Sequence, residues 1–134
     1  MQPECIFCQI IAGKVPSKMI HQNDLAMAIM ALEQEVPGHI IVFPKQHFAS
    51  LEVADDQSLL AIMTLITELG TQSLAAGFDS YNLLCADGKP AGQSVPHVHF
   101  HFIPRKTGDG LNAWPTFGYH GDVDGDALFR KLRF

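Results

Sequence analysis

Cysteine, charge and long apolar runs are all scarce in this sequence, and each shortage excludes a class of protein. Three cysteines among 134 residues are too few, and odd in number, for a disulfide framework. Charged residues make up 17% of the chain and the net charge is −5, so we expect no electrostatic binding to nucleic acid or to an anionic membrane. No apolar run reaches the roughly 20 residues of a membrane helix, and the first residues lack the basic and apolar segments of a signal peptide. We therefore expect a soluble, cytoplasmic protein.

The chain also lacks internal repeats and linkers, and its length fits a single domain over residues 1–134. A hydrophobic share of 47% is enough for a core and excludes disorder. Short apolar segments predict five strands, at 18–22, 25–32, 39–43, 81–85 and 97–103. Asn23 and Asp24 between the first two strands indicate a hairpin.

One long helix is predicted between the third and fourth strands. Asp55 or Asp56 would cap its start, and Gly77 would stop it after about residue 76. An apolar stripe at helical spacing is expected to fill the core: Leu59, Ile62, Met63, Ile66 and Leu69. Shorter helical segments are predicted at 5–12 and 127–132. Strands with one long helix favour an α+β fold with a mostly antiparallel five-stranded sheet, and the exposed sheet edges favour a homodimer.

Three of the seven histidines fall within residues 97–101. His97, His99 and His101 alternate with apolar residues, so on a strand the three imidazoles would share one face. A solvated polar face is the simplest alternative, although threonine, lysine or glutamate would serve it equally well. Imidazole can act as a metal ligand, an acid or base, or a nucleophile. Successive positions on a straight strand are widely spaced for ligands of one zinc ion, so a site made of all three histidines of this strand alone is awkward. A nucleophile with a phosphate-binding neighbour fits the spacing better.

The loop before this strand fits an anion. Gly88 and Gly92 allow main-chain N–H groups to approach a phosphate, and Gln93 and Ser94 can add side-chain donors. The loop is not a P-loop, because its glycines are not followed by the required lysine and hydroxyl residue. A glycine-containing loop alone is weak evidence, but its place directly before the histidines strengthens it.

The sequence resembles the histidine triad (HIT) family in three blocks that span about residues 4–105. The blocks are Cys5-Ile-Phe-Cys8 with Ile10 to Pro16, then Gly38-His39-Ile-Ile-Val-Phe-Pro-Lys-Gln-His47, and finally Gly92-Gln-Ser-Val-Pro-His-Val-His-Phe-His-Phe-Ile103. The resemblance implies a homodimeric α+β domain with a core at about 4–105 and a tail at 106–134. It also implies an enzyme that hydrolyses or transfers nucleoside monophosphates.

The resemblance also implies a role for each matching residue. His99 would be the nucleophile that becomes nucleotidylated, His101 would contact the α-phosphate, and His39 would support the site. Gly92, Gln93 and Ser94 would bind the substrate's phosphate or leaving-group oxygens. A carbonyl that accepts a hydrogen bond from the nucleophile's N–H would fix its tautomer. That chemistry requires no divalent ion.

Two positions depart from the usual family pattern. Ala31 stands where members usually carry an Asp that binds ribose hydroxyls, and Ala86 stands where an Asn usually helps to hold the phosphate. Each replacement removes a hydrogen bond worth roughly 0.5–1.5 kcal/mol. The departures affect nucleoside specificity more than the covalent chemistry, because His99, His101, Gln93 and Ser94 are retained. They motivate a non-catalytic nucleotide-binding module as the alternative to the enzyme, and a zinc-stabilised interaction module is a third possibility.

The Cys5-x-x-Cys8 pair has three interpretations: a chance pair, a redox pair, or half of a metal site. In zinc-containing members of the family, the matching cysteines join two histidines, here His47 and His97. The resemblance thus implies a structural zinc on Cys5, Cys8, His47 and His97.

The remaining candidates are expected to have ordinary roles. Cys85, in an apolar strand, is predicted to be a buried inert thiol. The Asp122-Val-Asp-Gly-Asp126 run lacks the sixth-position glycine and the final glutamate of an EF-hand. His21 and His120 are expected at the surface, and Trp114 in the core or at an interface.

Overall fold

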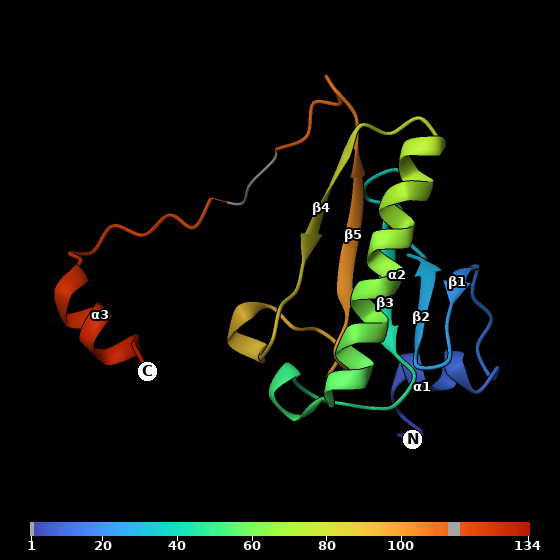
Figure 1. Ribbon diagram of the computed structural model, residues 1–134, viewed down its shortest axis with the longest axis horizontal. Helices are drawn as coiled ribbons and strands as arrows, with labels where there is room; N and C mark the ends of the chain where they lie inside the picture. The colour runs from blue at the N-terminus through green and yellow to red at the C-terminus, as the bar shows by residue number, and fades with distance from the viewer. Residues whose placement is uncertain (1, 113–115) are drawn as a thin grey trace.

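The computed structural model describes residues 2–112 and 116–134, and these form an α+β fold around one five-stranded sheet. The sheet order is β1-β2-β3-β5-β4, with every neighbouring pair antiparallel. The strands are Met19–Gln22 (β1), Ala26–Met30 (β2), Ile40–Pro44 (β3), Ser80–Leu84 (β4) and Phe100–Arg105 (β5). Figure 1 shows the long helix α2 lying across this sheet. The predicted fold class and the hairpin around Asn23 are confirmed.

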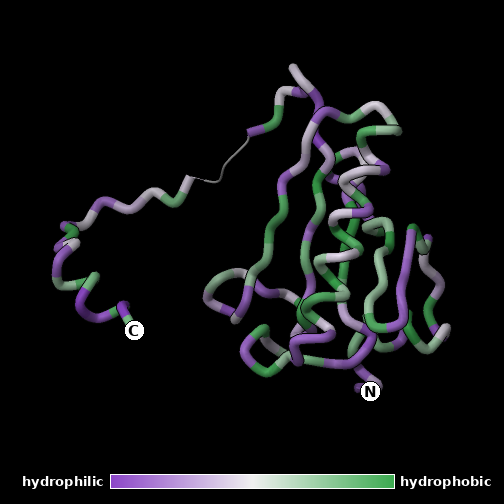
Figure 2. The backbone as a smooth tube through the Cα atoms, viewed as in Figure 1, coloured by the Kyte–Doolittle hydropathy of each residue, from purple (hydrophilic) through white to green (hydrophobic). Residues whose placement is uncertain are grey.

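Helix α2, Asp56–Ala75, is capped as predicted, because the Asp55 side chain accepts from the Ser58 N–H. Its alternating hydropathy is visible in Figure 2. The buried apolar residues are Ile62, Leu65, Ile66 and Leu69. The prediction that Met63 fills the core is wrong, since its side chain is 40% exposed and Leu65 packs instead. Met63 lies about 100° around the helix from Ile62, at the edge of the buried face.

By length and composition alone, α2 could cross a membrane. Two acidic residues, Asp56 and Glu68, interrupt its apolar run. In this fold its apolar face packs on Ala26, Ala28, Val42, Phe100 and Phe102 of the sheet, which is the arrangement of a core helix.

The opposite face of the sheet is covered by the short helix α1, Ile6–Ile11. Phe7 and Cys8 of this helix form a second core cluster with Cys5, Met27, Ile29 and Phe43. Because side chains alternate along a strand, β2 and β3 supply both clusters. The N-terminal block is therefore brought against the middle of the sheet.

Strand β5 begins three residues later than the sequence predicts. The main-chain N–H of Val98 bonds to the Phe48 carbonyl at 2.7 Å, and that of His97 bonds to the Val95 carbonyl. Val98 is therefore held by the loop that follows β3 and His97 by its own turn, and the ladder with β3 starts at Phe100. The triad spans a bend and a strand. Its rings lie on the side of the sheet that faces α1, as predicted, while the alternate apolar residues Val98, Phe100 and Phe102 join the core under α2. That side is not open, because His97 and His99 are buried.

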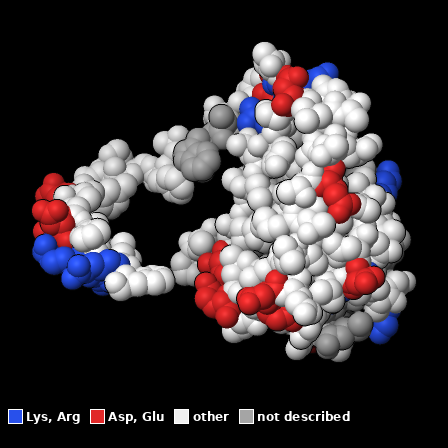
Figure 3. Space-filling view, viewed as in Figure 1, with Lys and Arg blue, Asp and Glu red and all other residues white. Residues whose placement is uncertain are grey.

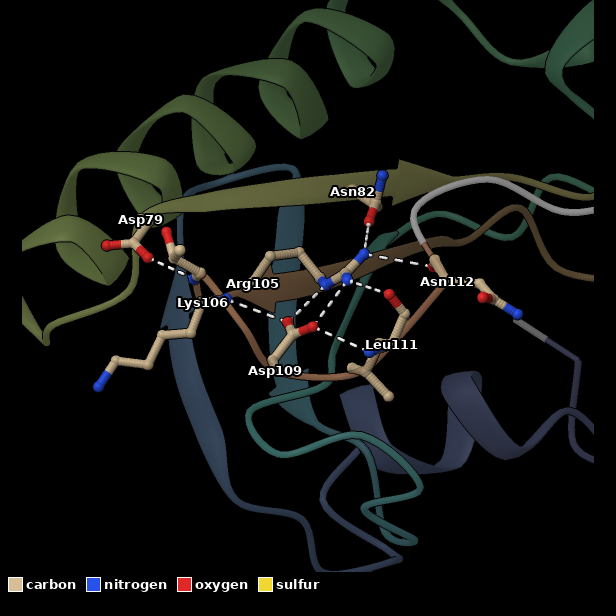
Figure 4. Close-up of polar contacts among 8 residues, drawn as sticks. Asp79, Asn82, Arg105, Lys106, Asp109, Leu111 and Asn112 are labelled. Atoms are coloured by element: carbon tan, nitrogen blue, oxygen red, sulfur yellow. Dashed lines mark hydrogen bonds and ion pairs between the residues drawn. The ribbon is translucent and has the colours of Figure 1, made fainter.

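An arginine at the end of β5 fixes the start of the tail (Figure 4). Arg105 pairs with both carboxylate oxygens of Asp109 and donates to Asn82 Oδ1 and to the carbonyls of Leu111 and Asn112. This hydrogen bonding holds the pKa of Asp109 well below its usual range. Residues 106–112 are thereby tied to the β4–β5 ladder.

The tail ends in helix α3, Gly125–Leu132, close to the predicted helical segment, with Asp124 as its N-cap. In Figure 1 this helix lies apart from the sheet. Figure 3 shows a group of Lys and Arg at this helix with a group of Asp and Glu beside it, and further acidic and basic groups scattered over the rest of the visible face. His120 and Asp122 are exposed, as is His21, which pairs with Glu68. The prediction for Trp114 lies outside the described residues.

The turn before β3 yields a stability prediction. Gly38 has φ +84°, and a Cβ there would lie 2.9 Å from Pro104 Cγ. We expect Gly38→Ala to lower the free energy of unfolding by about 2 kcal/mol or more, through left-handed strain and overlap. Gly13→Ala is the matched control, since Gly13 has φ +75° with nothing within 4 Å, so it should cost only about 1 kcal/mol. Urea unfolding measures both, and equal losses would show that the contact with Pro104 contributes nothing.

Candidate active site and metal site

Four side chains that the sequence analysis assigned to one metal meet beside α1. The potential ligand atoms of Cys5, Cys8, His47 and His97 all lie within 4.8 Å of one another. The His47 and His97 Nδ1 atoms are 3.2 Å apart. The Sγ atoms of Cys5 and Cys8 lie 3.4 Å and 3.7 Å from His97 Nδ1, and Cys8 Sγ is 3.4 Å from His47 Nδ1. Ligands around a tetrahedral zinc are about 3.3 to 3.8 Å apart. This cluster could hold a metal ion.

The ring of His97 is oriented for that role. Its Nε2 donates to the Pro44 carbonyl at 2.8 Å, so the Nδ1 lone pair faces the cluster. Burial lowers the pKa of His97 to about 4, which keeps the ring neutral near pH 7 as a ligand must be. Burial also raises the pKa of the Cys5 thiol, so a bound cation would have to displace its proton.

His99 is buried, with an exposed fraction of 5%, rather than lying on an open face. The phenyl ring of Phe7 covers it edge-on, with ring centroids 5.1 Å apart. His99 Nδ1 lies 2.8 Å from the main-chain carbonyl of His97. A carbonyl can only accept, so Nδ1 carries the proton and the lone pair is on Nε2. This is the tautomer that a nucleophile needs.

His101 and His39 form a second imidazole pair next to His99. His39 Nε2 lies 2.8 Å from His101 Nδ1, and the His99 and His101 ring centroids are 5.1 Å apart. Burial first, and then His99 and His39, lower the pKa of His101 to about 4. Burial also lowers the pKa of His39, against the opposing charge of Glu35. Both rings are therefore neutral near pH 7, and one donates to the other.

The loop before the triad is held by Gln93. Its side-chain oxygen accepts from the Gly88 N–H, and its amide nitrogen donates to the carbonyls of Ala49 and Val95. Gly92 has the left-handed conformation that turns the chain here. Gln93 thus shapes the loop in this structure, while Ser94 is exposed. Ser94 lines a cavity of about 460 Å³ together with Cys5 and His47.

A second cavity of about 520 Å³ opens on the other side of Phe7. Its apolar walls include Ile6, Phe7, Ile10, Ile29 and Ile41. Ile41 faces His101 across the β3–β5 ladder, which places this cavity next to the imidazoles. The cavity is large enough for a nucleoside-sized group.

The polar rim of this cavity offers few hydrogen-bond acceptors. Ala31 lies in its wall, and the polar lining residues are Ser17, Lys18 and Gln34. The Gln34 side chain is already engaged, donating to the Ala31 and His39 carbonyls and accepting from the Gly38 N–H.

Two residues differ from their sequence-based assignments. Cys85 is exposed rather than buried, because it lies beyond Leu84, the last residue of β4. Phe7 was not singled out, yet it contacts His97, His99 and the apolar cavity. The sequence feature that could have identified Phe7 is its position between Cys5 and Cys8.

Comparisons with known proteins agree with this geometry. A model of the HIT domain matches residues 12–108. An uncharacterised HIT-like protein of Methanocaldococcus jannaschii is 34% identical over 129 residues, covering 96% of this chain and 98% of the relative. An adenosine 5′-monophosphoramidase of Schizosaccharomyces pombe is 35% identical over 115 residues, covering 84% of each. A zinc-bound histidine triad family protein of Mycobacterium smegmatis has a similar structure, with a TM-score of 0.77 and 26% identity over 95% of this chain and 88% of the other. The family model and these relatives show that the chain belongs to the HIT family.

Proposed function

We propose that this protein hydrolyses or transfers nucleoside monophosphate groups through a covalent intermediate on His99. The substrate would be a nucleoside phosphoramidate or a dinucleoside polyphosphate. The observation that carries the proposal is the bond from His99 Nδ1 to the His97 carbonyl, which leaves Nε2 as a fixed lone pair. Relatives such as the fission yeast monophosphoramidase support the same reaction class.

The reaction would proceed in two displacements at phosphorus. His99 Nε2 attacks the α-phosphorus, the P–N or P–O bond to the leaving group breaks, and that group takes a proton from solvent. Water then attacks the same phosphorus and the bond to Nε2 breaks. The mononucleotide is released, the neutral imidazole is restored, and one proton of the water returns to solvent. Neither displacement requires a divalent ion.

The neighbouring groups would stabilise charge on the phosphoryl oxygens. If His39 donates from Nε2 to His101 Nδ1, neutral His101 carries its own proton on Nε2, where it can donate to an oxygen. Ser94 would add its hydroxyl as a donor to the phosphate. Gly92 and Gln93 would support the loop, because their main-chain N–H groups donate to the carbonyls of Lys89 and Gly88. Preorganised donors of this kind supply most of what phosphoryl transfer needs.

The apolar cavity of about 520 Å³ would hold the nucleoside. Its place beside Phe7 and Ile41 puts an attached phosphate next to His99 and His101. We also propose a homodimer, because β1 and β4 leave two edges of the sheet unpaired within the described residues.

We further propose that the metal at the Cys/His cluster is zinc in a structural role. Two thiolates and two imidazoles form the donor set that zinc prefers, and four protein ligands leave no open position for a substrate. The zinc-bound neighbour from Mycobacterium smegmatis supports this assignment. Zinc here would pin the N-terminal block to the sheet.

Replacing the nucleophile tests the reaction. We expect His99→Asn to lower turnover of adenosine phosphoramidate by at least about a thousandfold, because an amide nitrogen has no lone pair for phosphorus. The amide can still donate to the His97 carbonyl, so the variant should remain folded. Intact-mass spectrometry should detect a nucleotidyl adduct on the wild type and none on the variant. His21→Asn, at an exposed histidine, is the control. Full activity in His99→Asn would rule out this nucleophile. A wild type that binds nucleotide but shows neither adduct nor turnover would favour a non-catalytic module.

Elemental analysis tests the metal. The purified protein should contain about one zinc per chain, and the double variant Cys5→Ser, Cys8→Ser should contain none, because hydroxyls are poor zinc ligands. The melting temperature should fall with the zinc, since binding free energy contributes to folding. Cys85→Ser, at the exposed third cysteine, should keep both the zinc and the melting temperature. A zinc-free wild type whose Cys5 and Cys8 are alkylated in the native state would disprove the site.

The sugar specificity should reflect Ala31. Since its methyl group cannot accept from ribose hydroxyls, adenosine and deoxyadenosine phosphoramidates should differ by only a few-fold in kcat/KM. Ala31→Asp should raise the preference for ribose by about tenfold or more, the worth of one charged hydrogen bond. A wild-type preference above about 30-fold, roughly 2 kcal/mol, would show that another residue binds the hydroxyls.

A further inference from the structure

Helix α1 has little of its own to keep it in place. It is six residues long and has no side-chain cap at its start, where Cys5 is the N-cap residue. So short a helix is not stable in water unless other contacts hold it. Two of the four cluster residues, Cys5 and Cys8, lie in its first turn. The cluster is therefore the polar anchor of this helix.

Phe7 lies between those two cysteines and reaches three other parts of the site. It is 5% exposed and stacks on Phe43 with ring centroids 4.6 Å apart. Its ring meets His97 at 5.5 Å and His99 at 5.1 Å, edge to face in both cases. It also forms part of the wall of the apolar cavity. One side chain thus contacts a cluster histidine, the reacting histidine and the proposed nucleoside pocket.

We propose that Phe7 is a positioning residue that couples metal occupancy to the His99 ring and to the affinity of the pocket. The inference rests on the proposed function, because it takes His99 as nucleophile and the cavity as nucleotide site. The main chain provides a parallel link. His97 presents Nδ1 to the cluster and its carbonyl to His99 Nδ1.

The coupling follows from what holds α1 with and without an ion. A bound metal fixes both cysteines against His47 and His97, so Phe7 is held on the His99 ring. Without it the thiols are weak hydrogen-bond donors, and apolar packing alone restrains the first turn of α1. The pocket wall and the packing that orients His99 then loosen together. Thermodynamic linkage makes this effect reciprocal. If the metal raises the affinity for a ligand that contacts the pocket wall, that ligand must raise the affinity for the metal by the same factor.

The experiment measures AMP and zinc binding together, without turnover. Zinc removal should weaken AMP binding at least about tenfold by calorimetry, at a temperature where circular dichroism shows a folded apoprotein. Saturating AMP should raise zinc affinity by the same factor in competition with a chelating dye. In Phe7→Leu, zinc should still bind at one per chain. The ratio of AMP affinity in the zinc-loaded protein to that in the zinc-free protein should fall toward one. Leu69→Ala, a buried change on α2, is the control and should keep the wild-type ratio.

Two results would overturn the coupling. One is a wild-type ratio near one with both forms folded, and the other is a ratio that Phe7→Leu leaves unchanged. A nucleotide-free measurement separates this inference from the proposed function. Imidazole ¹⁵N spectra of zinc-loaded protein should show His99 in the Nδ1–H tautomer, with tautomer mixing in zinc-loaded Phe7→Leu. If the His99 spectrum changes in Phe7→Leu but the protein does not bind AMP, the nucleotide function is refuted and the coupling is retained. If the His99 spectra of zinc-loaded wild type and zinc-loaded Phe7→Leu are identical, the coupling is refuted, even where the apoprotein unfolds.

Discussion

The hydrogen bond from His99 Nδ1 to the carbonyl of His97 is the contact on which the rest of the site depends. A buried imidazole must satisfy its N–H, and here the acceptor lies two residues away in the same chain. That geometry requires residues 97–99 to leave the regular ladder, so their main chain is held by Phe48 and Val95 instead. The carbonyl can stay in place because the His97 ring is itself fixed, at Pro44 on one side and at the cluster on the other.

Burial acts in the same direction on three histidines of this site. It lowers the pKa of His97, His101 and His39 alike. Neutral imidazole is the form that can bind a metal, accept from a neighbouring ring or attack phosphorus. Phe7 and Phe43 form part of the apolar surroundings of His97, whose neutral ring suits a cluster that could hold a metal. Successive histidines along one segment can serve different chemistry because each ring has a different hydrogen-bond partner.

Most of the fold could be predicted from local patterns, because strand alternation, the helical stripe and the Asp55 cap are encoded by neighbouring residues. The four cluster residues and the triad could be named from their resemblance to a family. Burial of His99, exposure of Met63 and Cys85, and the late start of β5 could not be predicted in this way. The burial of His99 and the late start of β5 depend on contacts between distant segments; the Phe7–His99 contact joins residues 92 positions apart. Met63 and Cys85 instead lie just beyond the edge of a buried face and the end of a strand. Periodicity identifies a face of an element but not what covers it.

The hydrogen bonds of Arg105, the last residue of β5, affect where the folded unit ends. Its guanidinium is satisfied by Asn82 from the sheet and by Asp109, Leu111 and Asn112 from the tail. A chain cut just after β5 would lack Asp109. The guanidinium of Arg105, four residues from His101, would then have no carboxylate partner. A chain that ends after residue 112 would retain every one of these partners. The minimal unit for dissecting this protein is therefore set by the hydrogen bonds of one arginine rather than by the last residue of the sheet.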